Sequence, residues 1–166
     1  MKKLLHIHQF KSPVGTIGLA STDKGLALIN ITGAARFRER IRKSFNDYEI
    51  VSGGTENKKA EKQIKSYLAG RLKKFSLRID LMATPFQRKI LKKVALIPYG
   101  KVATYGDIAK AAGNSKASRA VGMANSRNPL PIVIPCHRVV AAGGLGGYGG
   151  GLSMKRRLLK LEASHI

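Results

Sequence analysis

The chain has 166 residues, and its 31 lysines and arginines against nine aspartates and glutamates give a formal net charge of +22. This length allows one domain or two small lobes, and an apolar fraction of 43% is enough for a buried core. No apolar run is long enough to span a membrane, and the first residues lack the pattern of a signal peptide. These features favour a soluble, cytoplasmic protein and argue against a disordered basic tail.

The basic residues are spread along the whole chain. Such an excess attracts polyanions and keeps protein molecules apart, so it favours a nucleic-acid partner and a monomer. A lysine-rich surface is also typical of proteins from hot environments, where it needs no partner. The charge alone leaves both interpretations open.

The first thirty residues predict a small antiparallel meander, because apolar and polar residues alternate between the turn signals at 12–15 and 23–25. From Thr32 the apolar residues fall four apart, which predicts a surface helix capped by Thr32. A second helix is expected to end before Gly70, and residues 75–79 are expected to form one more strand. Residues 1–80 are therefore predicted to form an α/β lobe with an antiparallel sheet.

Residues 81–166 are predicted to form a mainly helical domain. Thr84-Pro85-Phe86-Gln87 is a capping box, so a helix should begin there and run to Pro98. Two short helices then follow around a tight glycine turn, one ending at Gly113 and the next spanning about 116–125. This pair fits a helix-turn-helix (winged-helix-like) motif or an ordinary helical hairpin, and the basic composition favours the DNA-binding form.

Three prolines in 129–135 forbid a helix and predict an extended stretch that leads to Cys136. A glycine-rich loop follows at 143–151 and is interpreted as a flexible loop that closes over a ligand. The last helix is expected to turn Met154, Leu158 and Leu161 inward and its basic residues outward, namely Lys155, Arg156 and Lys160.

Cys136 is the only cysteine, which excludes an intramolecular disulfide and a cysteine-rich zinc site. A cysteine is nucleophilic as its thiolate, and cationic neighbours or a general base produce that form. His137 and Arg138 follow directly, although neighbours on an extended chain point to opposite faces. The alternative is a buried structural cysteine.

Two further patterns carry less weight. Gly144, Gly146 and Gly149 match a dinucleotide-binding spacing, but too little chain follows for the second strand and the acidic ribose ligand. His6 and His8 share one face of a strand, where a solvated surface is favoured over a metal site. The sequence therefore predicts no metal and no cofactor.

The segment 128–139, NPLPIVIPCHRV, resembles the O6-alkylguanine-DNA alkyltransferases, also called methylated-DNA–protein-cysteine methyltransferases. The resemblance extends to residues 117–122, to Tyr148 in the glycine-rich loop and to Glu162 in the final helix. It covers about 84–162, while the N-terminal half fits only as the variable lobe of such proteins. It implies an α+β protein with an N-terminal α/β lobe and a helix-turn-helix alkyl-acceptor domain at 81–166.

The resemblance also assigns the chemistry. Cys136 would take the alkyl group from guanine O6 by direct displacement and keep it as a thioether, so each molecule would act once. His137 would accept the thiol proton through a water, and Glu162 would hold the imidazole tautomer. Asn128 would brace the turn that carries the cysteine, and Tyr105 would assist departure of the guanine.

The remaining implied contacts are with the substrate. The carbonyls of Cys136 and Val139 would accept from the exocyclic amine, and the main-chain N–H of Gly149, beside Tyr148, would donate to O6. Gly149 stands where many relatives have serine, so the loop is expected to be mobile and to tolerate bulky adducts.

Arg119 would fill the gap left when the nucleotide is rotated out of the duplex, because the O6 carbon is out of reach inside the stack. Small residues around it would let the helix approach the minor groove: Ala117, Ser118, Ala120 and Gly122. Two other functions remain as alternatives, a non-catalytic DNA-binding regulator with Cys136 merely packed, and a cysteine-dependent hydrolase.

Overall fold

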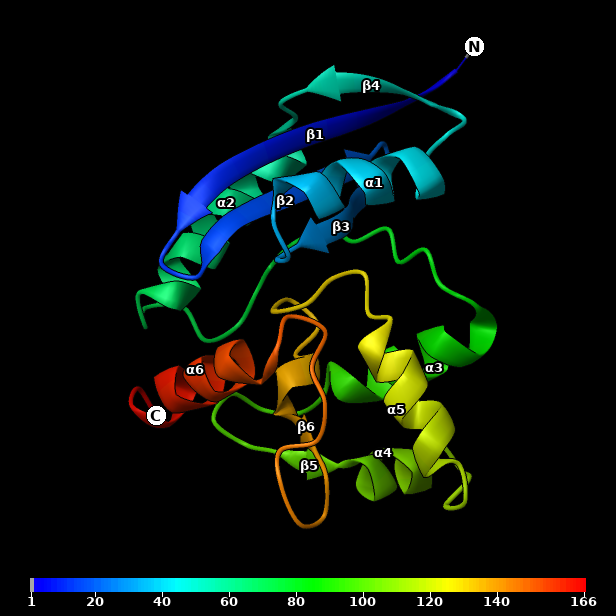
Figure 1. Ribbon diagram of the computed structural model, residues 1–166, viewed down its shortest axis with the longest axis vertical. Coiled ribbons are helices and arrows are strands. Elements are labelled where there is room, and N and C mark those ends of the chain that lie inside the picture. Colours follow the sequence, from blue (N-terminus) through cyan, green and yellow to red (C-terminus); the bar gives the residue numbers. More distant parts are fainter. Residues whose placement is uncertain (1) are drawn as a thin grey trace. The chain divides into compact units, whose positions relative to one another are not determined.

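The computed structural model describes residues 2–166, and the chain divides into two compact units after Met82. The first unit is built on a four-stranded sheet with the order β3-β2-β1-β4 (Figure 1). Its strands are β1 (Lys3–Ser12), β2 (Gly15–Thr22), β3 (Gly25–Asn30) and β4 (Tyr48–Ser52). The predicted antiparallel meander β1-β2-β3 is confirmed.

Two features of this sheet differ from the prediction. The edge strand β4 was not expected, and it pairs with β1 in parallel, so the sheet is mixed. The strand expected at 75–79 is absent apart from a single bridge between Ile79 and Leu26. The reason is that Ser76 is held by the side chain of Gln63 and not by a neighbouring strand.

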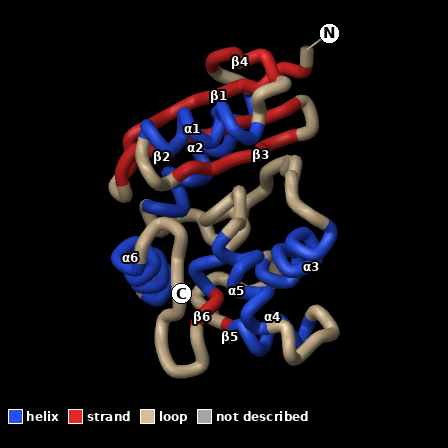
Figure 2. Tube along the Cα trace, turned by 45° about the vertical axis from the view of Figure 1, so that its right-hand side comes forward, coloured by secondary structure: helices blue, strands red, loops and turns tan. Residues whose placement is uncertain are grey.

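Helices α1 (Ala34–Ser44) and α2 (Thr55–Leu68) cover opposite faces of the sheet (Figures 1 and 2). Helix α1 buries Phe37 and Ile41 in a core that includes Leu5 of β1. The expected cap at Thr32 is wrong: Gly33 is the N-cap residue, and the Thr32 hydroxyl donates to Asn30 Oδ1 at 3.0 Å.

The second unit contains α3 (Pro85–Val94), α4 (Tyr105–Ala111), α5 (Ser118–Ser126) and α6 (Leu152–Ala163). Between them lie the two-residue strands β5 (Ala103–Thr104) and β6 (Val139–Val140), which pair in parallel, and the 3₁₀ turn η1 (Cys136–Arg138). The Thr84 capping box is confirmed, but α3 ends at Val94, earlier than predicted. Helices α4 and α5 lie where two short helices were expected.

The segment 129–135 is not extended as predicted. It folds back on itself, with the Ile134 N–H donating to the Leu130 carbonyl at 2.8 Å and Ile132 held at φ +75°. A positive φ is costly for a β-branched residue, so the surrounding contacts must impose this turn. Within residues 2–166, no helix is long and apolar enough to cross a membrane.

Candidate active site

Cys136 begins the 3₁₀ turn η1 and is only 4% exposed. Its approach is fixed by Asn128, whose side chain donates to the Ile134 carbonyl at 2.9 Å and accepts from the Leu130 N–H at 2.9 Å. Asn125 on α5 donates to the Cys136 carbonyl at 3.2 Å. Two buried amide side chains thus fix the turn that carries the cysteine.

Glu162 on α6 connects the residues that follow the cysteine. His137 Nε2 lies 2.5 Å from Glu162 Oε2, and Arg138 donates to both carboxylate oxygens, at 2.8 and 3.1 Å. The Gly100 N–H donates to Oε1 at 2.9 Å. Because an ionised carboxylate can only accept, the neutral imidazole carries its proton on Nε2 and its lone pair on Nδ1.

Burial controls the protonation of both site residues. It raises the pKa of the Cys136 thiol to about 11, although Asn128 and Lys155 act in the opposite direction. Burial also lowers the pKa of His137, and Glu162 opposes that shift. At neutral pH the site therefore holds a thiol and a neutral imidazole, so a nucleophile forms only if a base removes the thiol proton.

Lys155 is the main correction to the predicted final helix. It was expected to point outward, but it is fully buried, and its ammonium donates to the carbonyls of Val139 at 2.6 Å, Leu145 at 2.5 Å and Gly147 at 3.0 Å. Desolvation lowers its pKa, and the nearby Cys136 opposes this shift. The ammonium thereby ties the glycine-rich loop to the strand that follows the cysteine.

A cavity of about 210 Å³ is lined by two residues that interact with the cysteine. Asn125, which holds the Cys136 carbonyl, and Tyr148, whose hydroxyl lies beside the thiol, both line it. Burial, and then Cys136, raise the pKa of Tyr148 well above its ordinary value. The other lining residues come from α4, α5 and the glycine-rich loop: Tyr105, Gly122, Ser126, Gly147 and Gly149.

Tyr105 is the first residue of α4, and its hydroxyl accepts from the Gly147 N–H at 3.2 Å. Gly146 must be a glycine for two reasons. Its φ is +71°, and an added Cβ would lie 2.6 Å from the Tyr105 hydroxyl oxygen. The loop therefore packs directly on the tyrosine at one wall of the cavity.

Residues predicted to contact DNA lie at the start of α5. Arg119 and Ala120 are exposed, Ala117 and Ser118 are half-buried, and Gly122 faces the Tyr105 ring. The carbonyls expected to contact substrate already have partners: that of Cys136 binds Asn125, and that of Val139 binds Lys155. Each carbonyl oxygen keeps a second lone pair.

The sequence-based prediction gave no site role to Asn125 or Lys155, and it noted Arg138 only as a cationic neighbour of the cysteine. The buried residues of α6 are Lys155, Leu158 and Glu162, a 3-then-4 spacing that could have revealed the lysine. Elsewhere, His8 binds Glu61 at 3.0 Å, and the described residues hold no group of three side chains suited to a metal.

Comparison with known proteins gives one family. Residues 85–164 match the family model described as 6-O-methylguanine DNA methyltransferase, DNA binding domain. A methylated-DNA–protein-cysteine methyltransferase of Methanosarcina acetivorans is 43% identical over 160 residues, which cover 93% of this chain and 96% of that protein.

Solved structures agree with the sequence matches. The crystal structure of Mycobacterium tuberculosis O6-methylguanine methyltransferase aligns with a TM-score of 0.84 and 37% identity, covering 98% of this chain and 95% of that one. A structure of the M. tuberculosis protein in complex with DNA aligns with a TM-score of 0.83 and 36% identity, covering 97% and 94%. The chain therefore belongs to the methylated-DNA–protein-cysteine methyltransferase family.

Proposed function

We propose that this protein repairs DNA by moving the alkyl group of O6-alkylguanine onto Cys136. The observation that carries the proposal is the buried thiol, which is followed by a His137–Glu162 pair and lies near a cavity lined by Tyr105 and Tyr148. The thiol is held mostly as S–H, so the reaction needs the base that His137 offers.

In this proposal His137 takes the thiol proton through a water, and the sulfur attacks the alkyl carbon opposite O6. A carbon–sulfur bond forms while the carbon–oxygen bond breaks, and the guanine leaves with the electron pair. Tyr105 assists its departure by hydrogen bonding to the purine, and the Gly149 N–H donates to O6. Glu162 stabilises the charged imidazole that results.

The thioether product is stable, and the sequence contains no second cysteine that could regenerate the thiol. Each molecule therefore acts once and needs no cofactor. The O6 carbon is out of reach inside the base stack, so the nucleotide must leave the duplex before it reacts. Residues 83–166 would serve as the alkyl-acceptor domain.

Helices α4 and α5 act, in this proposal, as a helix-turn-helix on the minor groove. Arg119 enters the stack where the nucleotide has left, and the exposed or small residues beside it allow close approach of the backbone. The DNA-bound structure of the M. tuberculosis protein and the net charge of +22 support a DNA substrate, which a monomer would bind.

Intact-mass analysis after mixing the protein with duplex DNA containing O6-methylguanine tests the proposal. We expect a gain of one methyl group per molecule, located on the peptide that contains Cys136, and no further turnover with excess substrate. Binding to the duplex without any mass gain would instead identify a non-catalytic DNA-binding regulator. Repeated turnover would exclude the single-use mechanism.

A further inference from the structure

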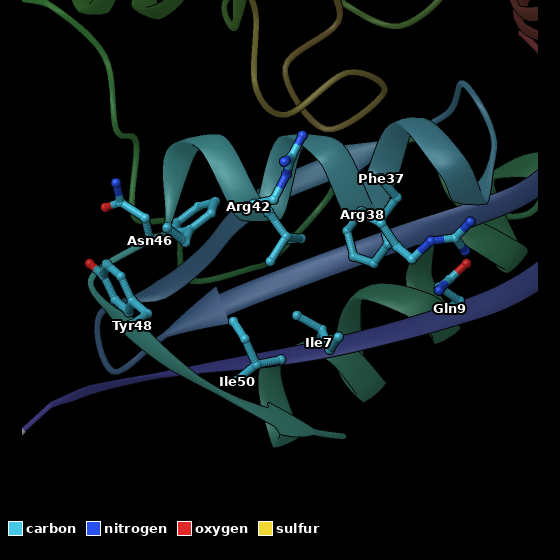
Figure 3. Close-up of a pocket in the computed structure, with 10 residues that line it drawn as sticks. Ile7, Gln9, Phe37, Arg38, Arg42, Asn46, Tyr48 and Ile50 are labelled. Carbon is cyan, nitrogen blue, oxygen red and sulfur yellow. The ribbon is translucent and has the colours of Figure 1, made fainter.

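The N-terminal unit carries an open groove of about 410 Å³ between α1 and the strands β1 and β4 (Figure 3). Ile7 and Ile50 point from the strands toward the helix and form its floor. Phe37 and Ile41 of α1 form the wall together with Phe45, the residue that follows the helix. The groove exists because α1 packs over β2, which leaves the edge strand β4 uncovered and Ile50 44% exposed.

The polar residues of the groove lie around this apolar centre. Arg38 extends along the groove toward Gln9, whereas Asn46 and Tyr48 lie together at the opposite end (Figure 3). Arg42 lies one helical turn after Arg38 and points away from the strands, so it marks the outer rim. The groove therefore has an apolar floor and wall and a cationic rim on the helix side.

We propose that this groove binds an acidic amphipathic helix of another protein. Its lining follows α1 from residue 37 to the end of the helix at residue 44, about 11 Å, which matches about two helical turns. Apolar side chains at i, i+4 and i+7 would cover Ile7 and Ile50, and carboxylates on the flank would meet Arg38. This partner is separate from the proposed DNA substrate.

Charge and chemistry select this partner over two others. A second copy of the chain, also at +22 and with nine acidic residues, would bring repulsion and not complementarity. The phosphates of a nucleic acid would pair with the arginines, but they would leave the apolar floor of the groove exposed to water. Only a segment with both apolar anchors and carboxylates matches both halves of the groove.

The probe for the test is a fluorescein-labelled synthetic helix of about 12 residues, three turns long, with leucines at the anchor positions and glutamates on one flank. Its control is a scrambled peptide of the same composition and charge, which measures general attraction to the basic surface. Binding to the full-length protein is followed by fluorescence anisotropy. We expect the patterned peptide to bind at least about tenfold more tightly than the scrambled one.

Matched variants locate the binding. Arg38→Gln should weaken binding about threefold, whereas Arg36→Gln, an equal charge change on the same helix outside the groove, should leave it unchanged. Ile50→Asn should weaken binding about tenfold or more, and Leu4→Asn, on the opposite face of the sheet and 46% exposed, should not. All four variants should keep wild-type transfer to O6-benzylguanine as the free base.

Three results would overturn the proposal. The first is equal binding of the patterned and scrambled peptides. The second is equal weakening by Arg36→Gln and Arg38→Gln, which would show attraction to the general charge. The third is full displacement of the peptide by undamaged duplex DNA together with loss of duplex affinity in Ile50→Asn, which would make the groove a nucleic-acid surface. Failure of alkyl transfer in the wild type would affect the proposed function and not this one.

Discussion

Arg138 donates two hydrogen bonds to the Glu162 carboxylate, from Nε to Oε1 at 2.8 Å and from Nη2 to Oε2 at 3.1 Å. Its remaining terminal nitrogen, Nη1, donates to the Ile97 carbonyl at 2.7 Å. The guanidinium therefore joins the end of the α3 region to α6 and fixes the carboxylate that His137 also contacts. Both ionic groups are buried, so neither charge can be removed alone without leaving the other unpaired.

We expect Arg138→Met to lower the free energy of unfolding by about 3–5 kcal/mol, because it leaves the Glu162 carboxylate buried without its cation. Arg138→Lys should cost less, since it keeps the charge and loses the two-point geometry. Urea denaturation followed by circular dichroism measures both. Equal costs for the two variants would show that the geometry, and not the charge, carries the stabilisation.

The rate of alkyl transfer should be flat near neutral pH and fall in acid. Burial lowers the pKa of His137 from its ordinary 6.5, so the ring is unprotonated at pH 7. It becomes protonated, and can no longer accept the thiol proton, only at lower pH. In the unfolded chain the same ring takes up a proton at about pH 6.5, so the folded state also loses stability as the pH falls below that value. Rates with O6-benzylguanine should therefore be recorded only where circular dichroism shows the native fold.

His137→Gln should change the shape of this profile. Without the base, transfer depends on the small fraction of thiolate, and a thiol pKa of about 11 predicts a rate that rises about tenfold per pH unit from neutral pH upward. The variant should be much slower than wild type at pH 7 and approach it in alkali. A flat profile in the variant would mean that another group removes the thiol proton.

Much of the fold could be predicted because its signals are local. The Thr84 capping box and the helical spacing of apolar residues lie within one or two turns of chain, and the structure confirms them. The parallel pairing of β4 with β1 could not be predicted, since it joins residues more than forty positions apart across α1. The turn at 129–135 depends on the Asn128 side chain, which residue propensities do not describe.

The candidate site also has a part that the sequence predicts and a part that it does not. The nucleophile and its neighbours stand together in the sequence, but Lys155 was assigned to the surface because lysines are rarely buried. What overrides this tendency is a set of three carbonyl oxygens that the loop and β6 present to the ammonium. These three carbonyl groups come together only when the chain folds, so the sequence does not show them as partners of Lys155.

Lys155→Met should therefore slow transfer at least about tenfold, because it leaves these carbonyls without a donor and removes a charge that favours the thiolate. Arg156→Met, an exposed cation one position later on α6, should have little effect. Limited proteolysis should cut the glycine-rich loop of Lys155→Met faster than that of the wild type. An unchanged rate with a more easily cut loop would restrict Lys155 to a structural role.

Gly146→Ala should disturb Tyr105 and the cavity together. The substitution costs about 1–2 kcal/mol for a left-handed backbone, and its Cβ has no room beside the tyrosine hydroxyl. Transfer to O6-benzylguanine should slow, whereas Gly143→Ala, where an added Cβ meets nothing within 4 Å, should behave like wild type. Equal rates in both variants would show that the Tyr105 contact is not needed for reaction.

The last prediction separates base capture from chemistry. Arg119 is exposed on α5, so Arg119→Ala should leave the fold intact and slow transfer from duplex DNA far more than transfer from the free base, which needs no flipping. Cys136→Ser keeps nearly the same shape but offers a hydroxyl that stays protonated, so it should abolish both reactions and keep the affinity for DNA. Rates with O6-methylguanine duplex and O6-benzylguanine, measured side by side, distinguish the two. If Arg119→Ala lowered both rates equally, the arginine would support the cavity and not the flipped state; if Cys136→Ser still gained an alkyl group, the acceptor would be another residue.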